Sequence, residues 1–490
     1  PWKQPQISYW QRRAPLSLMP APLPQTSQVV VIGAGLMGAC SSYWLSRRGI
    51  QVTVLEQQAP AFGATGRNGG FHVIGTAESY ASAIERHGHE TARAIYMLTL
   101  RSRTLLREVL AEEGLECEYR EPGRINLALS EDQFAESARS VKALHADGVS
   151  IDLLDRAQMQ ALINTPLGPD ICGGIYSSED GMLQPVRFVQ GVLAAAQRHG
   201  ARMCAATVLK VHENSDGVSV QTSAGTIHAE TLIVCANAWT SQLLPALEGI
   251  IRPVRGQALA FAPLPQVFKS GVGAAVTSTG EYWHQTPEGA IVLGGCRAIA
   301  PGGEVGVTSE GTTPEVQQAL EQVFPQLFPE LHGLQVQQRQ RLDQLGVVDG
   351  HQCRETVHRR GEAGHPGQQA LAGVGIVVQL VDPGVEPVAL RDGTLQFGMP
   401  TQHQAVQFLQ RRAGRCGAAL HIADPGQPLR GRNGPGLQQH AAQIAVERAD
   451  VRRLQRLGQA GQQAVQPGKV AVAQAGAGAA GFRHGGSPLV

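Results

Sequence analysis

The sequence predicts a mixed α/β (α+β) fold, in which a Rossmann-like βαβ domain is interleaved with an antiparallel-sheet domain and followed by an aberrant tail of low order. Residues 29–32 are a short run of β-branched residues, typical of a buried parallel strand. A Gly-rich turn, a helical segment at 39–48 and a second strand at 51–56 complete a βαβ unit. Helical and strand-like segments then alternate as far as Arg339, and the residues that follow show no steady periodicity.

The elements after the βαβ unit follow from periodicity and turn residues. Apolar residues at three- and four-residue steps predict helices at 81–113, 131–146, 188–199 and 238–246, with another after Pro314. Strand-like segments lie at 117–121, 125–129, 202–209, 218–222, 231–235, 253–262 and 291–295. Such βαβ units interrupted by antiparallel strands predict two interleaved domains in one chain.

Composition excludes several classes of function. The 490 residues include 41 Lys+Arg and 40 Asp+Glu, a formal net charge of +1. A chain without an overall basic field is not a general binder of nucleic acid or of anionic membranes. The most apolar stretch is far shorter than the roughly 20 residues of a membrane span. The eight cysteines are scattered singly, without zinc spacing, so we expect a cytoplasmic protein with reduced cysteines and no metal site.

A GxGxxG motif carries the strongest functional signal. Gly33, Gly35 and Gly38 lie between the first strand and the helix, and Glu56 ends the next strand about 20 residues on. This context predicts a dinucleotide site with its phosphates at the helix N-terminus and its ribose hydroxyls on Glu56. The first glycine permits the tight turn, the second a close approach to the pyrophosphate, and the third helix–strand packing. We assign to the same site the neighbouring residues Leu36, Met37 and Gln57.

A second Gly-rich loop follows soon after Glu56. Residues 63–71 read GATGRNGGF, which is unusual for a nicotinamide enzyme. Such a loop supplies backbone donors to a large cofactor and lets the chain pass close to a flat ring, although a plain surface loop has the same composition. The residues that we assign to the cofactor here are Thr65, Gly66, Arg67, Asn68, Gly69 and Gly70.

Together, residues 29–56 and the ATGRNGG segment at 64–70 resemble the FAD-dependent oxidoreductases of the D-amino-acid oxidase superfamily. The likeness is greatest to the branch of glycine/sarcosine-type oxidases and gamma-glutamylputrescine-type oxidoreductases. Further family-like stretches follow in order as far as residue 339, at 173–176, 180–181, 183–188, 207–208, 235–240, 252–257, 282–286 and 294–295.

The resemblance implies FAD as the cofactor and gives roles to matching positions. Val208 would hold the adenine through its backbone. Ala236 and Trp239 would lie beside the diphosphate and ribose, although Trp239 is equally explained as a core aromatic. Residues 67–70 would approach the isoalloxazine ring.

The resemblance also implies a reaction. Family members remove a hydride from the carbon next to an amine nitrogen and pass it to flavin N5, and the resulting imine is hydrolysed. The implied partners are a small amine or amino acid, and oxygen or an electron carrier as the final acceptor. Our candidate catalytic residues are Tyr282, His284 and Arg297, the last as a cation for a substrate carboxylate. For each of them a structural role is the alternative.

The same resemblance implies the division into domains. We expect an N-terminal arm (1–28) and an FAD-binding domain in two parts (29–80 and 185–252). The substrate domain is likewise in two parts (81–184 and 253–339), followed by the atypical tail (340–490).

The tail has a different composition from the rest of the chain. Residues 340–490 hold 16 basic and 10 acidic residues and are rich in Gly and Gln, and the flavin-capping loops of the family are not recognisable there. We interpret the tail as a frameshift product of GC-rich DNA, with a lineage-specific disordered tail as the alternative. A second functional hypothesis follows, in which the chain is a catalytically impaired family remnant whose basic tail binds an acidic partner. An aromatic hydroxylase of the related flavin fold is a further option.

Overall fold

The computed structural model describes residues 8–16, 18–309 and 311–348, together with short strands at 374–376, 388–391 and 394–397. No helix in this part of the chain is long and apolar enough to cross a membrane. The rest of the predicted tail lies outside the described residues. The cysteines that the structure describes are all free thiols: Cys40, Cys117, Cys172, Cys204, Cys235 and Cys296.

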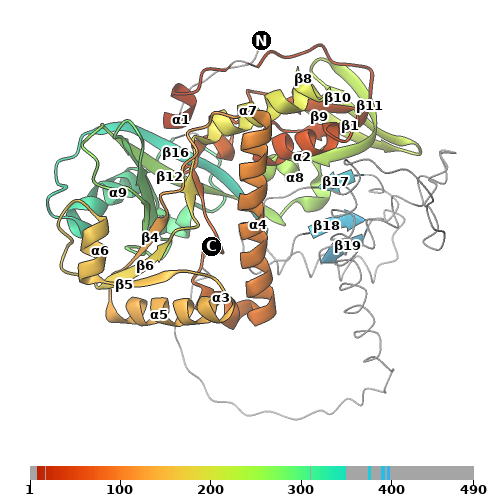
Figure 1. Cartoon of the computed structure of the whole chain (residues 1–490). Coiled ribbons are helices and arrows are strands. Elements are labelled where there is room, and N and C mark those ends of the chain that lie inside the picture. Colours follow the sequence, from red (N-terminus) through yellow and green to blue (C-terminus); the bar gives the residue numbers. More distant parts are fainter. Residues whose placement is uncertain are drawn as a thin grey trace, which may run out of the picture. The chain divides into compact units, whose positions relative to one another are not determined.

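The first sheet carries the predicted βαβ unit (Figure 1). Its central strand β1 (Thr26–Ile32) pairs in parallel with β2 (Val52–Glu56) on one side and with β11 (Gly225–Val234) on the other. The remaining strands are β8 (Arg202–Ala205), β9 (Val208–Asn214), β10 (Gly217–Thr222) and β17 (Val374–Ile376), the last paired in parallel with β11.

Both faces of this sheet are buried, as the run of β-branched residues predicts. Helices α2 (Leu36–Ser46) and α7 (Pro185–Arg198) form one core with the strand residues Val29 and Val31. Val30 belongs to a second core on the other face, with residues of β10 and β11 and of the segment that follows α8 (Thr240–Leu243). Because β1 and β2 are parallel, their C-terminal ends lie at the same edge of the sheet, and the N-terminus of α2 follows β1 there.

The second sheet is mixed and has eight strands. In spatial order these are β16 (Val336–Val348), β12 (Ile251–Phe261), β15 (Ile291–Gly294), β14 (Glu281–Gln285), β13 (Gly271–Ala274), β4 (Arg124–Ala128), β6 (Gly173–Ser177) and β5 (Asp152–Asp155). Helix α9 (Pro314–Leu327) packs on it, and Phe324 and Trp283 lie in the shared core. The structure also contains α5 (Glu131–Ala146) and α6 (Arg156–Leu162).

Several predicted elements differ from the structure. The helix predicted at 81–113 is two helices, α3 (Tyr80–His87) and α4 (His89–Glu113), because Gly88 adopts a φ of 81° between them. The strand predicted at 117–121 is reduced to a single bridge between Arg120 and Met182. The strand predicted at 202–209 is divided between β8 and β9.

Strand β16 crosses the predicted boundary at residue 340, although its register with β12 shifts between Val254 and Gly256 and again between Ala260 and Phe261. It pairs with β12 in an antiparallel register from Val336 to Val348. Strand pairing uses backbone groups, which every non-proline residue has, so the ladder continues where the side-chain composition changes. The short strands β17, β18 (Val388–Arg391) and β19 (Thr394–Phe397) also fall within the predicted tail. The division into domains stays a prediction, although the two sheets draw on alternating parts of the chain.

Candidate functional site

The three glycines of the first loop adopt three different geometries. Gly33 has a φ of 100°, which L side chains rarely adopt, and makes the turn out of β1. Gly35 precedes α2, and the nearest atom to a Cβ built there is Thr65 Oγ1, at 3.2 Å. A Cβ on Gly38 would lie 1.9 Å from the carbonyl oxygen of Gly33. The geometry at Gly33 and Gly38 is that of a tight turn and of close helix–strand packing, while the approach of Gly35 to a pyrophosphate stays a prediction.

The carboxylate of Glu56 is held by backbone amides. Its Oε2 accepts a hydrogen bond from Ala34 N at 2.9 Å, and its Oε1 accepts one from Gln58 N at 2.8 Å. Burial raises the pKa of Glu56, while the amides of Ala34, Gln58 and Gln57 oppose the rise. The side chain is therefore fixed at the edge of the sheet, where β2 ends.

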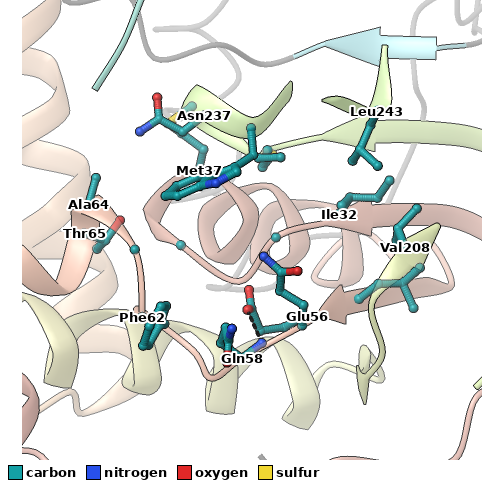
Figure 2. A pocket seen from close by; sticks show the side chains of 18 of the residues that line it. Ile32, Met37, Glu56, Gln58, Phe62, Ala64, Thr65, Val208, Asn237 and Leu243 are labelled. Carbon is teal, nitrogen blue, oxygen red and sulfur yellow. Dashed lines mark hydrogen bonds between the residues drawn. The ribbon is translucent and has the colours of Figure 1, made fainter. Parts of the chain in front are cut away.

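A pocket of about 380 Å³ opens between these elements. Figure 2 shows Ala64 and Thr65 at one end and Val208 at the other, with Met37 and Glu56 between them. The predicted cofactor residues that line it are Gly33, Gly35, Leu36, Met37, Glu56, Gln57, Thr65, Val208, Ala236 and Trp239. Its size lies within the usual range of small-molecule sites.

Other lining residues were missed from the sequence. They are Ile32, Leu55, Gln58, Phe62, Gly63, Ala64, Ala206, Thr207, Cys235, Asn237, Gln242 and Leu243. Most of them adjoin a predicted residue in the chain, so adjacency alone was a usable signal. Gln242 and Leu243 carry no such signal, because the short helix α8 brings them to the pocket.

The second Gly-rich loop begins in this pocket and then leaves it. Thr65 Oγ1 accepts a hydrogen bond from Leu36 N at 3.0 Å, which joins the loop to the N-terminus of α2. Gly66 and Arg67 lie behind the lining. A Cβ on Gly66 would come within 1.9 Å of the Ala61 carbonyl, and the Arg67 guanidinium lies 4.4 Å from the ring centroid of Phe62.

The end of this loop contacts strand β14 of the second sheet. A Cβ on Gly69 would lie 2.8 Å from Cε2 of Tyr282, and one on Gly294 equally close. Gly70, with a φ of 73°, lies beside His284, since a Cβ there would be 3.2 Å from Nε2. The structure thus brings residues 69–70 together with Tyr282 and His284, while the flavin and catalytic roles expected for these residues stay predictions. Asn68 Oδ1 accepts a hydrogen bond from Gly70 N at 2.8 Å, which tightens the turn.

Tyr282 and Arg297 influence each other electrostatically. Burial raises the pKa of Tyr282 to about 12, and the positive charge of Arg297 partly opposes this rise. Burial likewise lowers the pKa of Arg297. The Arg297 guanidinium donates a hydrogen bond to the Gly303 carbonyl at 3.2 Å. The phenol is therefore neutral at physiological pH, with a cation in its vicinity.

His284 is sealed inside the protein. Burial, and after it the nearby charge of Arg120, lowers its pKa to about 3, although contacts to the backbone of Gln285 and Gly69 act in the opposite direction. Arg120 Nη2 lies 3.4 Å from His284 Nδ1 and also donates to the Gln285 carbonyl. The imidazole is neutral and exposes only 2% of its surface. The sequence does not indicate Arg120 as a site residue, because neither the strand predicted at 117–121 nor the adjacent residues form a motif.

The pocket fits the adenosine-diphosphate part of a dinucleotide. A glycine-lined helix N-terminus stands at its centre, with an acidic residue at the end of the next strand. Residues 28–379 match the family described as "DAO: FAD dependent oxidoreductase". The chain belongs to this family. The match passes the point at Arg339 where the sequence resemblance was expected to end, and it includes β17, a strand of the first sheet.

Relatives and solved structures agree with this assignment. The chain is 28% identical over 254 residues to "Probable oxidoreductase OrdL" of Haemophilus influenzae, covering 50% of this chain and 58% of that protein. It is 24% identical to gamma-glutamylputrescine oxidoreductase of Escherichia coli, covering 69% and 80%. The structure is similar to glycine oxidase from Geobacillus kaustophilus, with a TM-score of 0.57, 19% identity and coverage of 66% and 84%. Family members use FAD, so FAD is the cofactor of this chain.

Proposed function

We propose that this chain oxidises the C–N bond of an amine or amino acid. The observation that carries the proposal is the path of the second Gly-rich loop. The loop lines the cofactor pocket at Thr65 and contacts the substrate-domain strand at Tyr282, only a few residues later. A substrate held by β14 is thereby close to the part of the cofactor that extends along the loop.

The chemistry that bound FAD supplies is acceptance at N5 of the hydride that leaves the carbon next to the substrate nitrogen. The nitrogen loses a proton, so the substrate gives up two electrons and two protons and becomes an imine. Water then hydrolyses the imine to a carbonyl compound and a free amine or ammonia. Oxygen or an electron carrier takes the two electrons in the second half of the reaction.

The protein's own residues bind and orient in this scheme. Arg297 supplies a cation near Tyr282 and is our candidate for binding a substrate carboxylate. Tyr282 stays protonated to high pH, so its hydroxyl is available as a hydrogen-bond donor. His284 stays neutral because burial lowers its pKa to about 3. It is therefore a weak base, and we assign it a positioning role in preference to proton transfer.

The test is the visible spectrum of the purified, desalted protein under anaerobic conditions, before and after addition of single amines. The panel contains gamma-glutamylputrescine, N-methyl-L-tryptophan, sarcosine and glycine. The first two compounds appear in the names of relatives of this chain. A yellow protein bleached by one of these supports the proposal and names the substrate class.

Other outcomes favour the alternatives. A yellow protein that no amine bleaches, but that oxidises NADPH, contradicts the proposal in favour of an aromatic hydroxylase. A protein that does not retain FAD supports the impaired remnant. Partner binding that weakens strongly with salt would support the role of the basic tail in that alternative.

A further inference from the structure

The N-terminal arm supplies hydrogen-bond donors to the second Gly-rich loop. Helix α1 (Tyr9–Arg12) begins at Ser8, whose Oγ donates to the carbonyl of Gly66 at 2.5 Å. The amide of Gln11 donates through Nε2 to the carbonyls of Ala61 and Phe62, at 3.2 and 2.9 Å. Ser8 and Gln11 are buried, so these bonds satisfy acceptors in the protein interior.

A third arm residue reaches the end of the same loop. The indole of Trp10 donates through Nε1 to the carbonyl of Asn68 at 2.7 Å. Its ring stacks on the imidazole of His284, with centroids 5.6 Å apart and planes 12° apart. His284 in turn contacts the backbone of Gly69. The Trp10 indole thus holds the Asn68 carbonyl, and the ring on which it stacks lies beside Gly70 of the same loop.

The arm is anchored independently of the loop. The side chain of Gln184 donates through Nε2 to the carbonyl of Trp10 at 2.8 Å, and Arg187 donates to the carbonyl of Arg13 at 3.2 Å. Both residues belong to the start of α7, a helix of the first sheet's core. The arm is therefore a fixed support, and Trp10 exposes only 1% of its surface.

We propose that Ser8, Trp10 and Gln11 are positioning residues of the cofactor site. They hold residues 61–70 in the conformation that borders the FAD pocket and reaches Tyr282. This inference rests on the proposed function, since it assigns the arm to the same site. Phe62 connects the arm to the pocket most directly, because Gln11 donates a hydrogen bond to its carbonyl and Phe62 itself lines the pocket.

Gln11→Leu in the full chain tests the proposal with a matched control. Gln160 in α6 is exposed, unlike Gln11, but makes the same kind of hydrogen bonds, donating to the carbonyls of Ile163 and Thr165 at 3.0 and 2.9 Å, among residues that do not line the pocket. The readouts are the FAD dissociation constant of the deflavinated protein, by quenching of flavin fluorescence, and its urea midpoint without FAD. We expect Gln11→Leu to raise the dissociation constant about tenfold, the equivalent of two lost hydrogen bonds. Gln160→Leu should leave the constant within about twofold of the wild type, because its bonds lie elsewhere.

Trp10 is tested by a conservative and a disruptive variant. Trp10→Phe keeps the stack on His284 and loses the bond to Asn68, so we expect a smaller rise in the dissociation constant than for Trp10→Leu. Trp44 in α2, which packs edge-on against Tyr43, supplies the control Trp44→Leu. The visible band of bound FAD should change in position or shape in Trp10→Leu and not in Trp44→Leu. A general loss of stability does not produce this difference.

Equal FAD affinity in Gln11→Leu, Trp10→Leu and their controls at matched urea midpoints would overturn the proposal. If the wild type binds no FAD, the proposal is tested instead by amide hydrogen exchange of residues 61–70 in the FAD-free protein. Faster exchange of this segment in Gln11→Leu than in Gln160→Leu supports the arm's role, and equal exchange refutes it. A wild type that binds FAD but is bleached by no amine contradicts the proposed function and leaves the role of the arm intact.

Discussion

The Cα of Gly38 lies against the carbonyl oxygen of Gly33, so closely that a Cβ at position 38 would come within 1.9 Å of that oxygen. The first turn of α2 is thereby packed directly on the turn that leaves β1. The helix N-terminus and the turn form one rigid unit, and both line the cofactor pocket. Any side chain at position 38 must separate them.

Gly38→Ala should therefore destabilise the protein by about 1–3 kcal/mol, the usual cost of overpacking. It should also weaken FAD binding, because the helix N-terminus moves away from the turn. Urea unfolding of the deflavinated protein and a titration with FAD measure the two effects. Gly191→Ala in α7 is the control, since its Cβ would meet only the flexible side chain of Leu115, at 3.2 Å. A Gly38→Ala variant as stable as the wild type would contradict the packing of α2.

Glu56→Gln should lower the stability of the FAD-free protein by about 1–2 kcal/mol. The carboxylate accepts from two backbone amides, Ala34 N and Gln58 N, with one oxygen each. A glutamine presents an NH₂ group to one of them, which leaves a buried donor without an acceptor. Urea unfolding of the deflavinated protein measures the effect, with the exposed Glu90→Gln as the control. Equal unfolding midpoints for the two variants would show that the carboxylate does not hold the turn.

The local parts of this site were predictable from sequence, and the long-range contacts were not. The turn at Gly33 and the acid at Glu56 belong to one βαβ unit, whose geometry follows from a short stretch of chain. The stack of Trp10 on His284 joins residues far apart in the sequence, and no periodicity indicates it. The sequence predicts an N-terminal arm at 1–28 but no contact for it, whereas Trp10 is buried and donates a hydrogen bond to the second Gly-rich loop.

The misplaced elements have equally local causes. The predicted helix at 81–113 overlooked Gly88, whose left-handed φ ends one helix and begins another. The boundary predicted after Arg339 relied on composition and on the missing flavin-capping loops, and neither reports on the backbone pairing of the residues that follow. Strand β16 continues to Val348 because β12 offers it backbone partners as far as Ile251, with two shifts in register.

His284 gives stability a dependence on pH whose sign follows from its lowered pKa. The native pKa is about 3, because of burial and then the charge of Arg120, whereas the ordinary value is 6.5. Below about pH 6.5 the unfolded chain therefore binds a proton that the native state does not bind, and stability falls as the pH falls toward 3. His284→Phe removes this proton while keeping an aromatic ring against Trp10.

Between pH 7 and pH 5 the wild type should therefore lose about 1–2 kcal/mol more than His284→Phe. Urea unfolding at pH 7, 6 and 5 measures this difference. The exposed His332→Gln is the control and should follow the wild type. Parallel curves for the wild type and His284→Phe would mean that the imidazole is accessible to solvent protons in the folded state.

Arg255 and Glu304 form a buried ion pair that holds the segment after β15. The side chains expose 5% and 3% of their surface, and Arg255 also donates to Ser309 Oγ at 2.8 Å and to the Gly311 carbonyl at 2.7 Å. Burial raises the pKa of Glu304, but hydrogen bonds from Arg255 and from Thr313 outweigh it, so the net shift is downward. Removing one partner leaves a buried charge uncompensated. Arg255→Met should thus lower the free energy of unfolding by about 3–5 kcal/mol.

The double variant Arg255→Met with Glu304→Leu separates stability from function. With no charge left uncompensated, it should recover most of the stability that Arg255→Met loses. The hydrogen bonds of Glu304 to Arg255 and Thr313 stay lost, so residues 297–304 are held less firmly at their C-terminal end. If Arg297 binds the substrate carboxylate, the double variant should show a raised KM for a carboxylate substrate and a nearly unchanged KM for an amine that lacks one. Equal changes for the two substrates would mean that the Arg255–Glu304 pair has no specific effect on carboxylate binding, whatever the stability of the variant.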